Sequence, residues 1–148
     1  MTSTAASAVI EHLGLSPHPE GGWYAETWRA ARAGGARPSA SAILYLLAAG
    51  EHSHWHRVDA AEIWQFSAGE PLELRIWAGD GSEVKTHRLG DGTTHDAGVP
   101  QVVVPAGAWQ AARPLGAWTL VGCIVSPAFE FAGFELAPDG WEPPGRGA

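Results

Sequence analysis

Two histidines separated by a single residue are the feature of this sequence that most directly suggests chemistry. They are His54 and His56, in the segment SHWHR. Residues i and i+2 of a β-strand point to the same face, so both imidazoles are predicted to lie on one side of a strand. Glu62 follows a short turn, and a hairpin would bring its carboxylate towards the two rings. Gln110, in the later segment PAGAWQ, is the fourth candidate for the same site.

These residue types support two different chemistries. Two imidazoles and a carboxylate form a ligand set for iron, manganese, nickel or zinc, and Gln110 would be a weaker neutral ligand in a metal site of His54, His56, Glu62 and Gln110. The alternative needs no metal, because an imidazole titrates near neutral pH. His56 would then be a general base with Glu62 as its acid or partner, and His54 would lie at the rim. The sequence leaves both interpretations open.

Further side chains are predicted to contact a small molecule. Tyr24, Glu26 and Trp28 share one face of a strand predicted over Trp23–Arg29. Trp64 shares the face of Glu62 and would form an apolar wall of the cavity.

Two arginines are candidates for binding a carboxylate, a phosphate or an enolate. Strand alternation places Arg57 opposite to His56, and Arg113 opposite to Gln110, so an ion pair at the surface or at a dimer interface is an equal alternative for each. Only one of Gln110 and Arg113 can face the cavity of a regular strand. Glu20, in the turn HPEGG, is interpreted mainly as part of a structural turn, and His18 as a turn residue.

The elements that would position these residues are short and β-like. Residues 71–77, PLELRIW, alternate apolar and polar side chains. Turn signals such as Gly-Asp-Gly and Pro-Ala-Gly separate the runs. The predicted strands are 23–29, 41–47, 54–57, 62–66, 71–77, 84–89, 101–104, 109–113, 118–125 and 129–136. This pattern predicts an all-β antiparallel sandwich or barrel, preceded by one short helix over Ser7–Leu13. The tail 137–148 is predicted to be loose unless Trp141 docks.

Composition excludes several classes of protein. The 148 residues suit a single domain, and the net charge of −7 with one lysine disfavours nucleic acid and acidic membranes as partners. Cys123 is the only cysteine, which excludes a disulfide framework and is interpreted as a buried structural thiol. No apolar run suits a spanning helix, no signal peptide is recognisable, and no nucleotide-binding fingerprint is present, so a cytoplasmic protein without a nucleotide cofactor is expected.

The sequence resembles the cupin superfamily. Its first motif corresponds to Gly50, His54, His56, Glu62 and Gly69, and its second to Gly98, Pro105-Ala-Gly107 and Gln110. Three blocks, LGLSPHPEGGWYAETWR, SHWHRVDAAEIWQFSAGEPLEL and PQVVVPAGAWQAARPLGAWTLVGCIVSPAFEFAGFEL, look like a bacterial and fungal cupin subfamily catalogued as a domain of unknown function. The resemblance implies a double-stranded β-helix, or jelly-roll barrel, over residues 13–136, usually dimeric and similar to dTDP-keto-sugar epimerases.

Two departures from the cupin pattern concern the metal site. Five residues separate His56 from Glu62 where the motif usually has three or four, and Gln110 stands where the third histidine is expected. The expected function is therefore an isomerase, an epimerase or a lyase that acts by acid–base chemistry on a carbonyl-bearing metabolite, with sugar derivatives among the candidates. The alternatives are a metal-dependent oxygenase or lyase, and a non-catalytic module that binds a small ligand or serves as a structural dimer. A homodimer is expected, and the expected cofactor is none or one divalent transition metal (iron, manganese, nickel or zinc).

Overall fold

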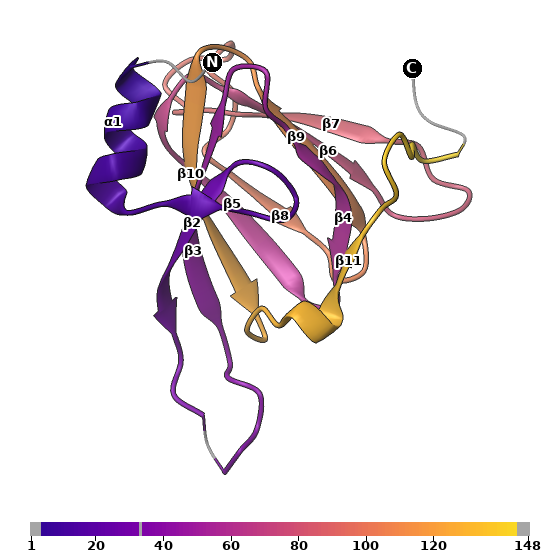
Figure 1. The fold of residues 1–148 in the computed structure, drawn as a ribbon. Helices are drawn as coiled ribbons and strands as arrows, with labels where there is room; N and C mark the ends of the chain where they lie inside the picture. The colour runs from indigo at the N-terminus through magenta and orange to yellow at the C-terminus, as the bar shows by residue number, and fades with distance from the viewer. Residues whose placement is uncertain (1–3, 33, 145–148) are drawn as a thin grey trace.

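Two antiparallel β-sheets pack face to face in the computed structural model, which describes residues 4–32 and 34–144 (Figure 1). The six-stranded sheet has the order β1 (Ser16–Pro17), β2 (Trp23–Arg29), β3 (Ser41–Ala48), β10 (Trp118–Ser126), β5 (Ala61–Gly69) and β8 (Gln101–Val104). The five-stranded sheet has the order β11 (Phe134–Leu136), β4 (Ser53–Val58), β9 (Trp109–Pro114), β6 (Leu72–Trp77) and β7 (Lys85–Leu89). The predicted all-β jelly roll is confirmed.

Alternating side chains explain how the two sheets form one core. In β6, Leu72, Leu74 and Ile76 are buried, while Glu73 and Arg75 between them are half-exposed. The buried side chains meet those of β3, β5 and β10, including Tyr45 and Trp64. Burial of large apolar side chains between the sheets is the main stabilising contribution to such a sandwich.

The N-terminal segment covers the outer face of the six-stranded sheet. Helix α1 (Thr4–Leu13) ends before Gly14, whose φ of +66° is a common way to terminate a helix. Val9, Ile10 and Leu13 lie on one side of the helix and pack over strands β3 and β10. Figure 1 shows the helix lying outside the barrel, so it supports the sheet that carries β2.

One sequence prediction about the C-terminal part needs correction. The strand predicted over 129–136 is a strand only in β11, because Phe131–Gly133 forms a 3₁₀ turn. For the predicted tail, the alternative in which Trp141 docks is the one observed over 137–144, since Trp141 lies 4.7 Å from Trp109 between ring centroids. The rest of that predicted tail, residues 145–148, lies outside the described residues. Of the helices in the described part of the chain, none is long and apolar enough to span a bilayer.

Candidate active site

Strand β4 carries a β-bulge that decides where its two histidines point. Ser53 pairs with Ala112 of β9, and His56 pairs with Gln110, so three steps along β4 match two steps along β9. One extra residue therefore lies between the two pairs. As a result Ser53 and His56 are both fully buried, whereas a regular strand would turn them to opposite faces.

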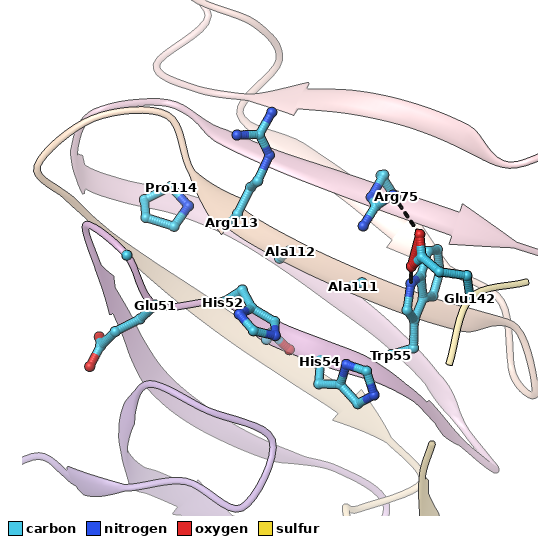
Figure 2. Close-up of a pocket in the computed structure, with 12 residues that line it drawn as sticks. Glu51, His52, His54, Trp55, Arg75, Ala111, Ala112, Arg113, Pro114 and Glu142 are labelled. Atoms are coloured by element: carbon cyan, nitrogen blue, oxygen red, sulfur yellow. Dashed lines mark hydrogen bonds and ion pairs between the residues drawn. The ribbon is translucent and has the colours of Figure 1, made fainter. Parts of the chain in front are cut away.

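His54 lies on the outer side of this bulge, and the prediction that it shares a face with His56 is wrong. Its Nε2 donates a hydrogen bond to the carbonyl oxygen of Pro138 at 2.9 Å. It borders a hollow on the outside of the five-stranded sheet, which Trp55 and Arg75 also line (Figure 2). His54 is thus separated from the barrel interior by the strand that carries it.

The turn HPEGG folds against the start of β4 and delivers Glu20 to the barrel interior. The His54 backbone N–H donates to the carbonyl oxygen of Glu20 at 2.9 Å, so the bulged strand pairs with this turn. Gly21 and Gly22 have φ values of +110° and +76°, and a Cβ atom on Gly21 would lie 2.1 Å from the carbonyl oxygen of His52. These two positions therefore require glycine.

Glu20 and His56 form a buried pair inside the barrel. Their side chains are 9% and 2% exposed, and Oε1 of Glu20 lies 3.4 Å from Nε2 of His56. The second oxygen of Glu20 accepts a short hydrogen bond from the hydroxyl of Ser53. The role of Glu20 was missed from the sequence. A signal was present, because the turn Pro-Glu-Gly-Gly does not itself need a charged side chain at the position of Glu20.

The hydrogen bond at the other ring nitrogen fixes the tautomer of neutral His56. Nδ1 lies 2.8 Å from the carbonyl oxygen of His54, and a carbonyl oxygen can only accept. The proton of the neutral ring is therefore on Nδ1, and Nε2 faces Glu20 with a free electron pair. This is the arrangement that a general base requires.

His18 presents the opposite tautomer. Its Nδ1 accepts a hydrogen bond from the backbone N–H of Glu20 at 3.1 Å, so neutral His18 carries its proton on Nε2. Nδ1 also lies 3.5 Å from Oε1 of Glu20, but an acceptor nitrogen makes no charged contact there. The imidazole ring of His18 packs edge-on against the ring of Tyr24, with 4.5 Å between the ring centroids. Its Nε2–H has no hydrogen-bond acceptor recorded among the described residues and is available to a ligand in the cavity.

Glu62 reaches the same interior from the opposite sheet. Strands β4 and β5 belong to different sheets, so the expected hairpin is absent and the two residues meet across the barrel. Oε1 of Glu62 accepts a hydrogen bond from Nε2 of Gln110 at 2.9 Å. Oε1 of Gln110 accepts one from the indole N–H of Trp64 at 2.7 Å. Because an indole can only donate, this chain fixes the amide of Gln110 with its NH₂ towards Glu62.

Burial shifts the pKa of each of these groups towards its neutral form. Burial raises the pKa of Glu20, and it raises the pKa of Glu62 to about 7 despite the opposing effects of His56 and Gln110. Burial lowers the pKa of His56, against the opposing influence of Glu62, and it also lowers the pKa of His18. Protonatable carboxyls beside neutral imidazoles are typical of acid–base sites.

The four groups border a cavity of about 490 Å³ between the sheets. Its walls include the apolar side chains of Ile43, Val58, Val125, Phe129 and Phe131, and Cys123 lies at its edge. The Cys123 thiol is buried, and burial raises its pKa well above the usual value, in agreement with its interpretation as a structural thiol. The volume is in the range of small-molecule sites.

Strand β2 contributes the predicted Tyr24 and Glu26 to this cavity, but not the predicted Trp28. The register of β2 on β3 shifts between Glu26 and Trp28, so that Arg29 lines the cavity with Glu26. Trp28 is 53% exposed. Arg29 was missed because the alternation of a regular strand assigns it to the other face.

The remaining predicted ligand-binding residues do not line the cavity. Arg57 is exposed, pairs with Glu135 at 2.7 Å and covers the ring of Trp109. Arg113 is exposed and donates to Glu73 at 2.9 Å. Both are therefore surface ion pairs, and Gln110 is the residue of β9 that faces inwards. Gln110 and Trp64 are buried behind Glu62 rather than exposed to the cavity.

The predicted metal ligands do not converge. His54 lies outside the barrel, and the amide of Gln110 directs its NH₂, which has no lone pair for a metal, towards Glu62. Within residues 4–32 and 34–144, no three His, Cys, Asp or Glu side chains form a group able to hold a metal ion. The predicted set His54, His56, Glu62 and Gln110 therefore does not fit a metal.

Several known proteins are similar to this chain over most of its length. A family model described as cupin superfamily (DUF985) matches residues 7–137. A solved structure of a protein from Shewanella oneidensis is 38% identical, with a TM-score of 0.82 over 89% of this chain and 84% of that one. A hypothetical protein from Leishmania major is 30% identical, with a TM-score of 0.81 over 89% and 86% of the two chains.

More distant likeness is confined to the fold. Oxalate decarboxylase from Bacillus subtilis is 12% identical, with a TM-score of 0.60 over 81% of this chain and 29% of that one. Among curated proteins, none matches the sequence. From the family match over nearly the whole chain and the two similar structures, we conclude that this protein belongs to the DUF985 family of the cupin superfamily.

Proposed function

We propose that this protein is an isomerase, epimerase or lyase that moves a proton on a carbon atom next to a carbonyl group of a small molecule. The observation that carries the proposal is the unprotonated Nε2 of His56, which faces Glu20 at 3.4 Å at the edge of the cavity. A neutral imidazole with a fixed tautomer, next to a protonatable carboxyl group, is suited to accept a proton from carbon.

The other polar groups have complementary roles in this proposal. When Nε2 of His56 takes the proton, the electron pair of the C–H bond forms the double bond of an enolate, and negative charge develops on the carbonyl oxygen. The Nε2–H of His18 can donate a hydrogen bond to that oxygen. Glu62, with a pKa of about 7, can hold a proton at neutral pH.

The final step decides the type of reaction. Return of a proton to the same carbon from the other face would give epimerisation, and its return to the neighbouring carbon would give isomerisation. Loss of a leaving group from the β-carbon, with a proton supplied by Glu62, would give elimination. Each route needs the same first step, so that step is the one to test.

The test is exchange of carbon-bound protons for deuterium, followed by NMR in D₂O over a panel of aldoses, ketoses and α-hydroxyketones. We expect His56→Asn to slow exchange of any accepted compound by at least ~100-fold, because the base is removed. His54→Asn is the matched control, since it deletes an imidazole of the same strand on the outer face. Equal rates in the wild type and His56→Asn, or no exchange with any compound that binds, would contradict the proposal and leave a binding role.

A further inference from the structure

The charges around the cavity are unevenly distributed. Four of the lining residues are acidic, namely Glu20, Glu26, Glu62 and Glu130. Arg29 is the only lysine or arginine among the residues that line it. The two lining imidazoles have pKa values lowered by burial and are neutral at neutral pH. Arg29 is therefore the one fixed positive charge among the lining residues.

The positive charge of Arg29 is already compensated. Its Nε and one terminal nitrogen donate to the two carboxylate oxygens of Glu26 at 3.0 and 2.9 Å, and the same terminal nitrogen donates to the carbonyl oxygen of Phe129 at 2.8 Å. A bidentate pair of this kind is among the stronger protein ion pairs. An incoming anion would have to compete with Glu26 for this guanidinium group.

The neighbouring arginine at the rim is also occupied. Arg37 donates to both carboxylate oxygens of Asp59 at 3.0 and 2.8 Å and lies 3.4 Å from Glu130. Its charge is shared between two carboxylates. The two arginines predicted from the sequence to hold an anion, Arg57 and Arg113, pair with Glu135 and Glu73 away from the cavity.

The polar groups of the interior are suited to uncharged partners. Nε2 of His56 can accept a hydrogen bond, Nε2–H of His18 can donate one, and the carboxyl groups of Glu20 and Glu62 can bond to hydroxyls. Ile43, Val125 and Phe129 provide apolar contact beside them. Hydroxyl and carbonyl groups satisfy this set. A carboxylate or phosphate would find no uncompensated cation in this poorly solvated space, and it would lie near Glu62, which with a pKa of about 7 is ionised in part at neutral pH.

We propose that the ligand of this cavity is an uncharged hydroxycarbonyl compound, such as a free sugar or a small polyhydroxy ketone, and that phosphorylated or carboxylated counterparts are excluded. The carbonyl in this assignment rests on the proposed acid–base function, while the exclusion of anions rests on the charges alone.

Ligand-observed NMR titration can test this with matched probes: dihydroxyacetone against dihydroxyacetone phosphate, and glucose against glucuronate. We expect each anion to bind at least ~10-fold more weakly than its uncharged counterpart. In the double variant Glu20→Gln, Glu62→Gln the difference in affinity between each uncharged probe and its anionic counterpart should become smaller, because glutamine keeps an acceptor oxygen but carries no charge. The control is Glu73→Gln, Glu142→Gln, which changes the net charge equally outside the cavity and should leave this difference unchanged.

Three results would contradict the proposal that the ligand is uncharged. The first is an anion that binds as tightly as its uncharged counterpart, and the second is an affinity difference that is the same in both double variants. The third is no binding of either uncharged probe at millimolar concentration. This measurement does not depend on turnover. If no compound exchanges deuterium but uncharged probes still bind more tightly than anions, the acid–base role is refuted and the assignment of an uncharged ligand stands. The reverse pattern would refute only the ligand class.

Discussion

At the scale of single residues, Gln110 shows how one side chain determines the properties of another. Its amide accepts a hydrogen bond from Trp64 and donates one to Glu62, and all three side chains are buried. Because both ends of the amide are engaged, Glu62 receives a neutral donor rather than a cation. Burial can therefore keep the pKa of Glu62 near 7.

This arrangement predicts the effect of Trp64→Phe. The substitution leaves the buried Oε1 of Gln110 without a donor, so we expect the free energy of unfolding to fall by about 1–3 kcal/mol from this bond, in addition to the loss of volume. Trp77→Phe is the matched control, since the indole N–H of Trp77 donates to the carbonyl oxygen of Ser82 at 3.2 Å in a half-buried place where water can replace it. Urea unfolding measures the loss in the free energy of unfolding for each of the two variants. Equal losses would contradict the role assigned to the Trp64–Gln110 bond.

At the scale of elements, two irregular strands and one docked segment build the site. The bulge in β4 turns Ser53 and His56 inwards, and the shift in β2 turns Glu26 and Arg29 towards the cavity. On the outside of β4, the segment 137–144 covers the five-stranded sheet. The backbone N–H of Ala137 donates to the carbonyl oxygen of Trp55 at 3.0 Å, which ties this segment to the bulged strand.

Trp141 is predicted to hold that segment in place. Its ring lies 4.7 Å from Trp109 and 6.1 Å from Trp55 between centroids. We expect Trp141→Ala to lower the free energy of unfolding by about 1–3 kcal/mol, less than for a fully buried tryptophan, and to speed hydrogen exchange at residues 137–142. Trp28→Ala removes an equally large but exposed side chain and should cost less than about 0.5 kcal/mol. Unchanged exchange at residues 137–142 would show that Trp141 does not hold the segment.

At the scale of the whole molecule, the buried titratable groups make stability depend on pH in opposing directions. Glu62 has a higher pKa in the folded protein than in the unfolded chain, so its contribution decreases as the pH rises from about 4.5 through 7. His56 and His18 have lowered pKa values, so their contribution decreases as the pH falls below the unfolded value of 6.5. Between about pH 4.5 and 6.5 the loss of stability from Glu62 and the gain from the two histidines on raising the pH partly offset each other.

Glu62→Gln separates these effects. Glutamine can still accept the hydrogen bond from Gln110 but cannot ionise, so above pH 7 the variant should be more stable than the wild type by about 1–3 kcal/mol. Below about pH 3.5, where Glu62 is protonated in both the folded and the unfolded protein, the difference should vanish. Thermal unfolding from about pH 3 to 8.5 measures this, with Glu142→Gln as a surface control expected to stay within about 0.5 kcal/mol at every pH. A variant that is less stable than the wild type at pH 8 would contradict the assignment.

Local patterns in the sequence were sufficient to predict the fold class and most of the strands of this protein. Alternation in segments such as Leu72–Trp77 predicted the β-sandwich. Strand parity set Arg57 opposite to His56 and Arg113 opposite to Gln110, but it left open whether Gln110 or Arg113 faces inwards. These predictions succeed because the direction of a side chain in a regular strand depends only on its position along that strand.

The tertiary structure alone decided the composition of the site. Parity failed at His54 and at Arg29, because an extra residue in a strand is defined by the register of its partner strand, which lies far away in the sequence. Glu20 and His18 entered the site because their turn packs against β4, and Gly21 makes that close approach possible. The sequence by itself determined the β-barrel and predicted that His56 and Glu62 contribute to one site. The contacts between distant segments determined which base, which carboxyls and which charges surround the cavity.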